Sequence, residues 1–153
     1  MAIGLTLRKY LAENGVAYDV LPHTHTSSSM NTAQSAHISG KNLAKSVILE
    51  DDKGYLMAVV PATEHVKFRK VNHALNRHLG MATEPELETL FSDCELGAIP
   101  AVSNAYSMES IVDDKLANCS DIYFEAGNHE DLIHMKGSSF RRLTKHSRHA
   151  AIS

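Results

Sequence analysis

Residues 43–60 read LAKSVILEDDKGYLMAVV, two apolar runs on either side of a polar turn. The runs 43–49 and 55–60 are rich in β-branched residues, which favour strands. Between them, Asp51-Asp52-Lys53-Gly54 supplies the residue types that form tight turns. The stretch therefore predicts a β-hairpin, and the rest of the fold is best considered around it.

On the N-terminal side, apolar residues at helical spacing predict a first helix that stops at Gly15. Residues 16–21 then predict a short strand closed by Pro22, and residues 23–30 a polar loop. A second helix is expected over 31–38. Asn31 and Gln34 are spaced like a capping box at its start, and Gly40 would end it.

On the C-terminal side, the apolar positions of 71–79 predict a helix that Gly80 stops. Thr83 and Glu86 form a second capping box, with Pro85 in the first turn of the helix that follows. The remaining expected elements are a strand or tight loop over 97–102, strands over 108–112, 121–126 and 131–135, and a final helix over 138–144.

Strands and helices are therefore interspersed, and hairpins are more evident than long crossover helices. This pattern favours an α+β fold with a mixed sheet over a doubly wound fold. A length of 153 residues suits one domain spanning 1–153.

The composition excludes several other classes of protein. A hydrophobic content of 43% and a charged content of 22% are ordinary for a globular chain, and they argue against a disordered or coiled-coil protein. The longest apolar stretch is residues 55–62, far short of the roughly 20 residues that span a membrane. Arg8 and Lys9 interrupt any secretory signal, and two cysteines form no disulfide framework, so we expect a cytoplasmic location.

Charge is unevenly distributed along the chain, although the formal net charge is only −3. Residues 1–83 carry nine basic and six acidic side chains, and residues 132–153 carry five basic and none acidic. Residues 84–131 carry twelve acidic side chains and one lysine. Because local fields matter more than totals, a nucleic-acid partner remains open.

Ten histidines raise the question of metal binding. His129 and His134 are five residues apart, whereas the helical zinc motif requires a spacing of four. His23 and His25 flank a single residue, and Cys94 and Cys119 have no neighbour at zinc-ligand spacing. We therefore expect no metal and no cofactor. Acidic neighbours of Cys94 argue against a reactive thiolate there, and a buried structural cysteine is the preferred interpretation.

Two local features are unusual. Lys45 interrupts an apolar strand, where it either points to solvent or aims a charge at a phosphate or carboxylate. Gly97, followed by Pro100, forms either a plain turn or a loop that presents backbone N–H groups to a ligand carbonyl.

Taken together and in this order, these features resemble the YbaK/prolyl-tRNA synthetase editing-domain family, which hydrolyses mischarged aminoacyl-tRNA. The resemblance spans nearly the whole chain. Its segments are the first helix, the strand before His23, residues 43–49, Ala58-Val59-Val60-Pro61-Ala62, Asp93-Cys94-Glu95-Leu96-Gly97-Ala98-Ile99-Pro100, and Phe124-Glu125-Ala126-Gly127-Asn128-His129. It implies a partly barrel-like sheet flanked by helices.

The resemblance also implies roles for individual residues. Lys45 would hold the 3′-terminal adenosine and the ester, and Gly97 and Ala98 would offer amides to the ester carbonyl. His129 would line the aminoacyl pocket, and Ser46 follows the lysine at a position where relatives vary with specificity. The remaining residues expected to contact the substrate are His23, Ile99, Pro100, Ala101, Gly127 and Asn128.

The implied reaction is hydrolysis, by water, of an ester between tRNA and a small amino acid such as Ala, Cys, Ser or Thr, with tRNA-Pro as the expected carrier. The sequence shows no obvious protein general base, so assistance by the terminal ribose hydroxyl is one hypothesis. The expected partners are the acceptor end of tRNA and, as a further option, a synthetase. The two basic segments of the chain would flank Lys45, and no membrane is expected.

The chain departs from the family at the glycine loop. Ala101 occupies the position of the family's proline, Pro100 comes one residue early, and Ser103 replaces a common glycine. Because proline fixes φ, these differences bear on the shape of the loop. They favour the alternative of a non-catalytic module that binds a tRNA end, an adenylate or a synthetase.

Overall fold

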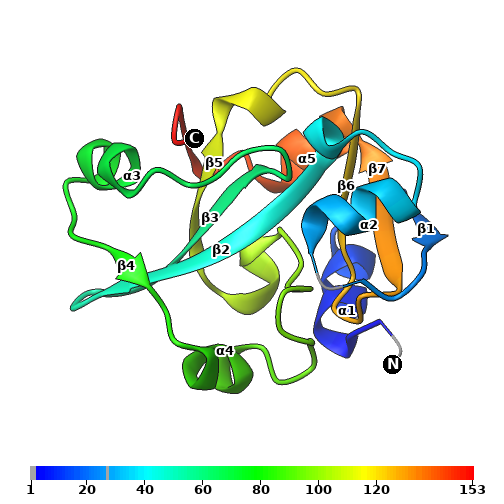
Figure 1. Cartoon of the computed structure of the whole chain (residues 1–153), viewed down its shortest axis with the longest axis horizontal. Helices are drawn as coiled ribbons and strands as arrows, with labels where there is room; N and C mark the ends of the chain where they lie inside the picture. Colours follow the sequence, from blue (N-terminus) through cyan, green and yellow to red (C-terminus); the bar gives the residue numbers. More distant parts are fainter. Residues whose placement is uncertain (1–2, 27) are drawn as a thin grey trace.

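The sheet is built around the predicted hairpin. In the computed structural model, which describes residues 3–26 and 28–153, β2 (Leu43–Asp51) and β3 (Gly54–Pro61) pair antiparallel as far as Asp51↔Gly54. Figure 1 shows this long hairpin crossing the middle of the molecule. The hairpin prediction is confirmed.

Seven strands form one continuous path in the described part of the chain. Their order is β1 (Asp19–Pro22), β7 (Asp131–Lys136), β6 (Asp121–Glu125), β2, β3, β5 (Glu109–Asp113) and β8 (Arg148–Ala150). The two-residue β4 (Gly80–Met81) pairs with β2 beside this path. The pairs β2–β6, β3–β5 and β5–β8 are parallel and the others are antiparallel, which confirms the mixed sheet of an α+β fold. The path runs from β1 to β8 without closing.

Five α-helices surround the sheet in the described residues: α1 (Leu5–Glu13), α2 (Ser29–Ser35), α3 (Phe68–Leu75), α4 (Glu84–Leu90) and α5 (Gly137–Leu143). Three short 3₁₀ turns, η1 (Gly40–Asn42), η2 (Ser103–Tyr106) and η3 (Asp114–Leu116), complete the structure. In Figure 1, α3 and β4 lie at one end of the molecule, and α1, α2 and β1 lie at the other.

Alternation along β2 divides the core into two sides. Ala44 and Ile48 belong to the largest apolar cluster, together with Phe91, Phe124 and Phe140. Leu43 and Leu49 face the opposite side, where they belong to two smaller clusters. Because successive strand residues point to opposite faces, Lys45 and Ser46 also lie on opposite sides of the sheet.

Several helices and strands begin or end at other residues than the sequence predicts. Ser28, not Asn31, caps α2, and its hydroxyl accepts a hydrogen bond from the Asn31 amide at 3.2 Å. The helix predicted to run to Gly80 ends at Leu75, because Asn76 takes a left-handed conformation with φ 52° that asparagine tolerates. The first strand starts at Asp19 instead of residue 16. The capping box of Thr83 and Glu86 is confirmed at the start of α4.

One edge of β2 is left open in its middle. β6 pairs only with Leu43 and Ala44, and β4 pairs only with Leu49 and Glu50. Between them, residues 45–47 have a strand partner only on the β3 side within the described chain. We call residues 45–47 the open edge, and the predicted site residues Lys45 and Ser46 both belong to it.

Within the described residues, none of the helices has the length and apolar character needed to traverse a lipid bilayer.

Candidate active site

The loop of residues 97–101 lies against the open edge. The Ser46 hydroxyl donates a hydrogen bond to the Ile99 carbonyl at 2.8 Å, which fixes the loop to β2. Ala98, Ile99 and Ala101 are buried, whereas Gly97 is exposed. The loop therefore presents Gly97 outward from a firmly packed base.

Gly97 is in contact with His129. Its backbone has φ +83°, and a Cβ at this position would lie 3.2 Å from Cε1 of the His129 ring. Only glycine fits both the conformation and the approach at low energetic cost. His129 Nε2 lies 2.5 Å from the Leu96 carbonyl oxygen, so the imidazole is also bonded to the residue before Gly97.

A tight turn at residues 127–129 holds His129 in this place. The Asn128 side-chain oxygen accepts hydrogen bonds from the amides of Glu130 and Asp131 at 3.0 and 2.9 Å. The Gly127 carbonyl accepts a hydrogen bond from the Glu95 amide at 2.8 Å. The Asn128 bonds hold the turn in shape, and the Gly127 bond joins the turn to the segment just before the glycine loop.

The amides of the loop are not equivalent. The Ala98 N–H donates to the Glu95 carbonyl at 3.1 Å and is thus engaged within the loop itself. The N–H groups of Gly97 and Ile99 have no hydrogen-bond acceptor in the described part of the chain. The amides of Gly97 and Ile99 are therefore unengaged among the described residues, whereas the amide of Ala98, the expected donor, is already bonded within the loop.

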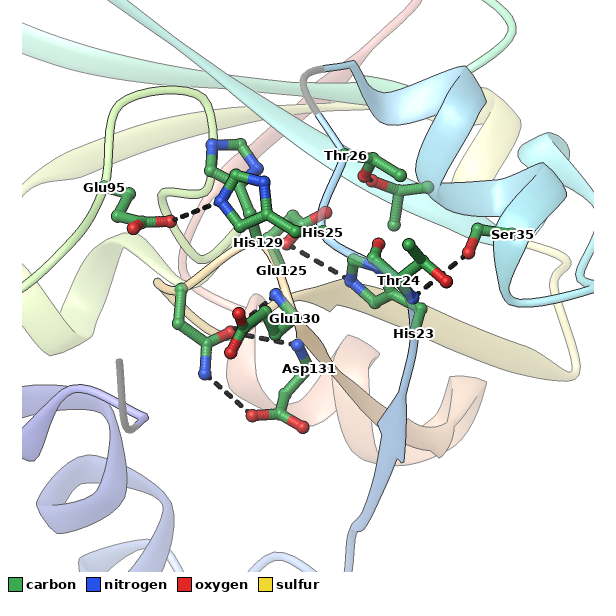
Figure 2. Close-up of polar contacts among 12 residues, drawn as sticks. His23, Thr24, His25, Thr26, Ser35, Glu95, Glu125, His129, Glu130 and Asp131 are labelled. Atoms are coloured by element: carbon green, nitrogen blue, oxygen red, sulfur yellow. Dashed lines mark hydrogen bonds and ion pairs between the residues drawn. The ribbon is translucent and has the colours of Figure 1, made fainter.

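Figure 2 shows a cluster of imidazoles and carboxylates, formed by His23, His25, Glu95, Glu125 and His129. His23 Nε2 is 3.8 Å from Glu125 Oε2, and both side chains are almost completely buried. Burial raises the pKa of Glu125, and Thr32, His23 and His129 partly offset this rise. The cluster combines the loop after β1 with the end of β6, which is distant in sequence.

The outer part of the cluster reaches solvent. His25 Nε2 is 3.4 Å from Glu95 Oε2, and the rings of His25 and His129 have centroids 5.3 Å apart. The His25 side chain is 57% exposed, and the His25 residue borders a surface hollow shared with Thr26, Asn31, Gln34 and Ser35. His25 therefore connects the buried part of the cluster with this hollow.

Lys45 occupies a second hollow on the opposite face of β2 from Ser46. Its neighbours there are Val47, His65, Val66, Phe68 and Met81. Burial lowers the pKa of the Lys45 ammonium, against the attraction of Glu64. In the described part of the chain Lys45 makes no ion pair, because Glu64 is bound by Lys115 at 2.7 Å.

The structure therefore brings most predicted site residues together and sets Lys45 slightly apart. Ser46 and His129 contact the glycine loop, His23 lies against Glu125 in the adjoining cluster, and Pro100 and Ala101 are buried residues of the loop itself. By the register of β2 and β6, Lys45 shares a sheet face with Glu125 where the two strands separate. The open edge is bordered by Lys45 on one face and by the glycine loop on the other.

Three members of the cluster, His25, Glu95 and Glu125, were not predicted as site residues. The sequence does hold a sign that Glu125 is unusual, because this carboxylate stands between the apolar residues Phe124 and Ala126. His25 and Glu95 are joined only by tertiary contacts, which no local pattern predicts. Cys94 is half-buried: burial raises the pKa of its thiol to about 12, which disfavours a thiolate, and its sulfur contacts the Tyr106 hydroxyl at 3.3 Å.

Comparison with known families matches residues 22–143 to the aminoacyl-tRNA editing domain. The match covers most of the chain, including the open edge, the glycine loop and the turn that carries His129. The chain belongs to the aminoacyl-tRNA editing domain family. No curated protein matches it.

Solved structures show the same editing-domain fold at low sequence identity. A protein described as a candidate trans-editing enzyme for prolyl tRNA synthetase is 18% identical, with a TM-score of 0.82, over 97% of this chain and 94% of that one. The hypothetical protein APE2540 is 17% identical, with a TM-score of 0.84, over 96% and 98% of the two chains.

A third structure, of a candidate signal transduction protein from Marinobacter aquaeolei VT8, is 20% identical with a TM-score of 0.81. The match covers 99% of the editing domain described here but only 31% of that longer chain. The same fold thus also occurs as part of a larger protein.

Proposed function

We propose that this chain is a trans-editing hydrolase, which cleaves the ester bond between a tRNA and a wrongly attached small amino acid. Membership of the aminoacyl-tRNA editing domain family supports the reaction class. The observation that carries the proposal is the exposed Gly97, held by His129 and Ser46 beside the open edge that also bears Lys45.

In the proposed mechanism, the ester carbonyl lies at Gly97. As water attacks, negative charge develops on the carbonyl oxygen, and the N–H groups of Gly97 and Ile99 would stabilise it. Such donors contribute about 3–4 kcal/mol each where one has been removed from another enzyme. The bond between the carbonyl carbon and the ribose oxygen then breaks, and the ribose oxygen takes up a proton.

Lys45 would bind the phosphate or ribose of the terminal nucleotide. Its ammonium has no competing ion pair within the described residues, and the exposed side chain of Phe68 lies in the same hollow, beside an exposed Met81. A point charge beside an aromatic ring suits a nucleotide, because the charge binds phosphate and the ring can stack on a base. This arrangement would position the ester at the glycine loop on the other side of β2.

The amino acid and the tRNA form the finer part of the proposal. A pocket discriminates a single methylene by only about 1–3 kcal/mol, so synthetases charge small wrong amino acids at a measurable rate. We infer that the substrate carries Ala, Cys, Ser or Thr, with tRNA-Pro as the first candidate, that the protein acts in the cytoplasm, and that a synthetase is a further partner. One domain spanning 1–153 would carry the whole activity.

The test is a panel of tRNA-Pro species mischarged with Ala, Cys, Ser and Thr. We expect the wild type to deacylate at least one of them, and Lys45→Ala to lose at least tenfold of that rate while it remains folded. Lys53→Ala, an exposed lysine at the turn of the same hairpin, is the matched control and should retain full activity. Wild-type turnover in Lys45→Ala would exclude the role given to Lys45.

The alternative is a binding module of the same fold without catalysis, which Ala101 in place of the family's proline favours. A protein that binds mischarged tRNA but hydrolyses none of the panel would establish this alternative.

A further inference from the structure

Among the described residues, four buried polar atoms of the site lack a hydrogen-bond partner: His23 Nε2, Glu95 Oε2, Glu125 Oε2 and His129 Nδ1. They come from three separate segments, namely the loop after β1, the loop after α4, and β6 with the turn that follows it. The ion-pair contacts of His23 with Glu125 and of His25 with Glu95, at 3.8 and 3.4 Å, lack hydrogen-bond geometry.

All four atoms are hydrogen-bond acceptors. His23 Nδ1 lies 2.7 Å from the Thr24 carbonyl, and His129 Nε2 lies 2.5 Å from the Leu96 carbonyl. Because a carbonyl oxygen only accepts, each of these nitrogens carries a hydrogen, and when the ring is neutral its other nitrogen is an acceptor. Carboxylate oxygens accept as well. We call His23, Glu95, Glu125 and His129 the acceptor pocket.

A pocket lined only by acceptors is costly to the protein alone. Buried polar atoms are almost always hydrogen-bonded, and each unpaired one costs about 1–3 kcal/mol. Acceptors cannot satisfy one another, so a ligand group that carries N–H donors would complement them. With two carboxylates among the four residues, the complementary ligand group is a small cation that carries several N–H donors.

A metal ion fits less well. Among the described residues, no three His, Cys, Asp or Glu side chains converge closely enough to hold one. A primary ammonium differs from a metal ion in the geometry that it needs, because its three N–H donors reach acceptors at hydrogen-bond distance in separate directions.

The acceptor pocket lies directly beside the proposed position of the ester carbonyl. The His129 ring contacts Gly97, and Glu95 is two residues before it. In an aminoacyl ester, one carbon atom separates the α-ammonium from the carbonyl carbon. A substrate whose carbonyl lies at Gly97 therefore carries its ammonium to the neighbourhood of His129 and Glu95.

We propose that the acceptor pocket binds the α-ammonium group of the aminoacyl ester, with Glu125 as its principal anionic partner. The inference rests on the proposed function, because it takes the substrate class from it. It adds that the protein recognises the free α-amino group that every aminoacyl ester shares, so the acceptor pocket selects for an amino acid in general and leaves the choice among side chains to other residues.

The test uses two stable probes that differ in one group. They are adenosine analogues that carry a 3′-amide in place of the ester, one with an alanyl group and one with a propionyl group. We expect the wild type to bind the alanyl probe roughly tenfold or more tightly than the propionyl probe, because charge-assisted hydrogen bonds are made only by the ammonium. Binding is measured by calorimetry and by NMR shifts of the histidine rings.

Glu125→Gln keeps the size of the side chain but removes its charge, and it should reduce the preference for the alanyl probe to near one. Glu95→Gln, at a less buried position, provides a second variant should Glu125→Gln fail to fold, and it should also reduce the preference. Glu88→Gln, an exposed carboxylate on α4, makes the same change of charge outside the acceptor pocket and should leave the preference intact.

Equal binding of the two probes by the wild type would overturn the inference. So would a preference that survives in both Glu125→Gln and Glu95→Gln, or no binding of either probe at millimolar concentration. The proposed function can fail on its own. If the protein prefers the alanyl probe but hydrolyses no mischarged tRNA, the inference stands and the proposed activity is wrong. If the protein hydrolyses mischarged tRNA but shows no preference for the alanyl probe, the proposed activity stands and the inference is wrong.

Discussion

Gly97 and Gly15 share a left-handed backbone, with φ +83° and +60°, but their surroundings differ. A Cβ on Gly97 would approach the His129 ring, whereas a Cβ on Gly15 would meet nothing within 4 Å. Gly15 follows the end of α1, where the left-handed conformation alone requires glycine. This pair separates the effect of backbone strain from the effect of contact with the site.

Gly97→Ala and Gly15→Ala should therefore lose stability to a similar extent, about 1–2 kcal/mol, because each forces an alanine into the left-handed region. Only Gly97→Ala should also lose deacylation, by at least tenfold, since its methyl group displaces His129. Chemical denaturation and the mischarged-tRNA assay measure the two effects. Equal activity in both variants would contradict the role of Gly97.

Glu125 should make stability fall as pH rises. Burial raises the pKa of Glu125 above its ordinary value of 4.5, so the folded state holds the proton more tightly than the unfolded state. Stability is then lost progressively from about pH 4.5 upward through the raised folded pKa. Glu125→Gln removes this loss, so its stability relative to wild type should increase between pH 4 and pH 7. Denaturation at both pH values measures it, and a difference independent of pH would contradict it.

At the level of elements, the β2–β3 hairpin is fastened to the end of α3. Arg77 donates two hydrogen bonds to the Asp51 carboxylate, at 2.7 and 2.5 Å, just before the hairpin turn. The hydrogen bond from Arg77 lowers the pKa of Asp51 to about 2. The contact positions α3, which supplies Phe68 to the hollow around Lys45.

Asp51→Asn should reduce stability at neutral pH, because it removes the charge that Arg77 binds. A carboxylate with a lowered pKa stabilises the folded state above its ordinary value of 3.8, and this contribution disappears as pH falls towards 2. The variant and the wild type should therefore converge in stability as the solution is acidified over that range. Asp52→Asn, at the exposed neighbouring position, should differ little from wild type at any pH.

Elements with local signals were predictable from the sequence. The hairpin and the capping box of Thr83 and Glu86 are encoded within a few residues, and both are confirmed. The end of α3 was wrong by several residues, because Asn76 stops the helix before the apolar pattern does. The cluster of His23 with Glu125 depends on pairing between β1, β7 and β6, which no local pattern specifies.

At the scale of the whole molecule, the two basic segments, residues 1–83 and 132–153, meet at the end that carries α3. The Lys70 ammonium donates to the Ser153 carbonyl and the Arg148 guanidinium to the Ala74 carbonyl, each at 3.0 Å, so the C-terminal strand packs beside α3. Lys67, the N-cap residue of α3, and Arg69 in its first turn are exposed next to the hollow around Lys45. The acidic helix α4 lies away from α3 in Figure 1.

Binding of tRNA should weaken steeply as salt concentration rises, because basic side chains that contact phosphates release counterions. Replacing Lys67 and Arg69 together by Ala should lower the affinity and flatten the dependence of log K on log salt by roughly 1.5. Arg8→Ala with Lys9→Ala on α1, near the other end of the molecule, makes the same change of charge and should have little effect. Equal slopes for the two double variants would contradict this orientation of the tRNA.

The open edge of β2 has a consequence for solubility. Unpaired strand edges invite pairing with another chain, and proteins usually shield them. Here the shield is the glycine loop itself, attached through Ser46 and Ile99. Substitutions that detach the loop, such as Ser46→Ala, would therefore expose residues 45–47 to pairing with a strand of another molecule. We expect such variants to aggregate during expression. The need to avoid aggregation and the proposed need to hold a substrate thus act on the same few residues.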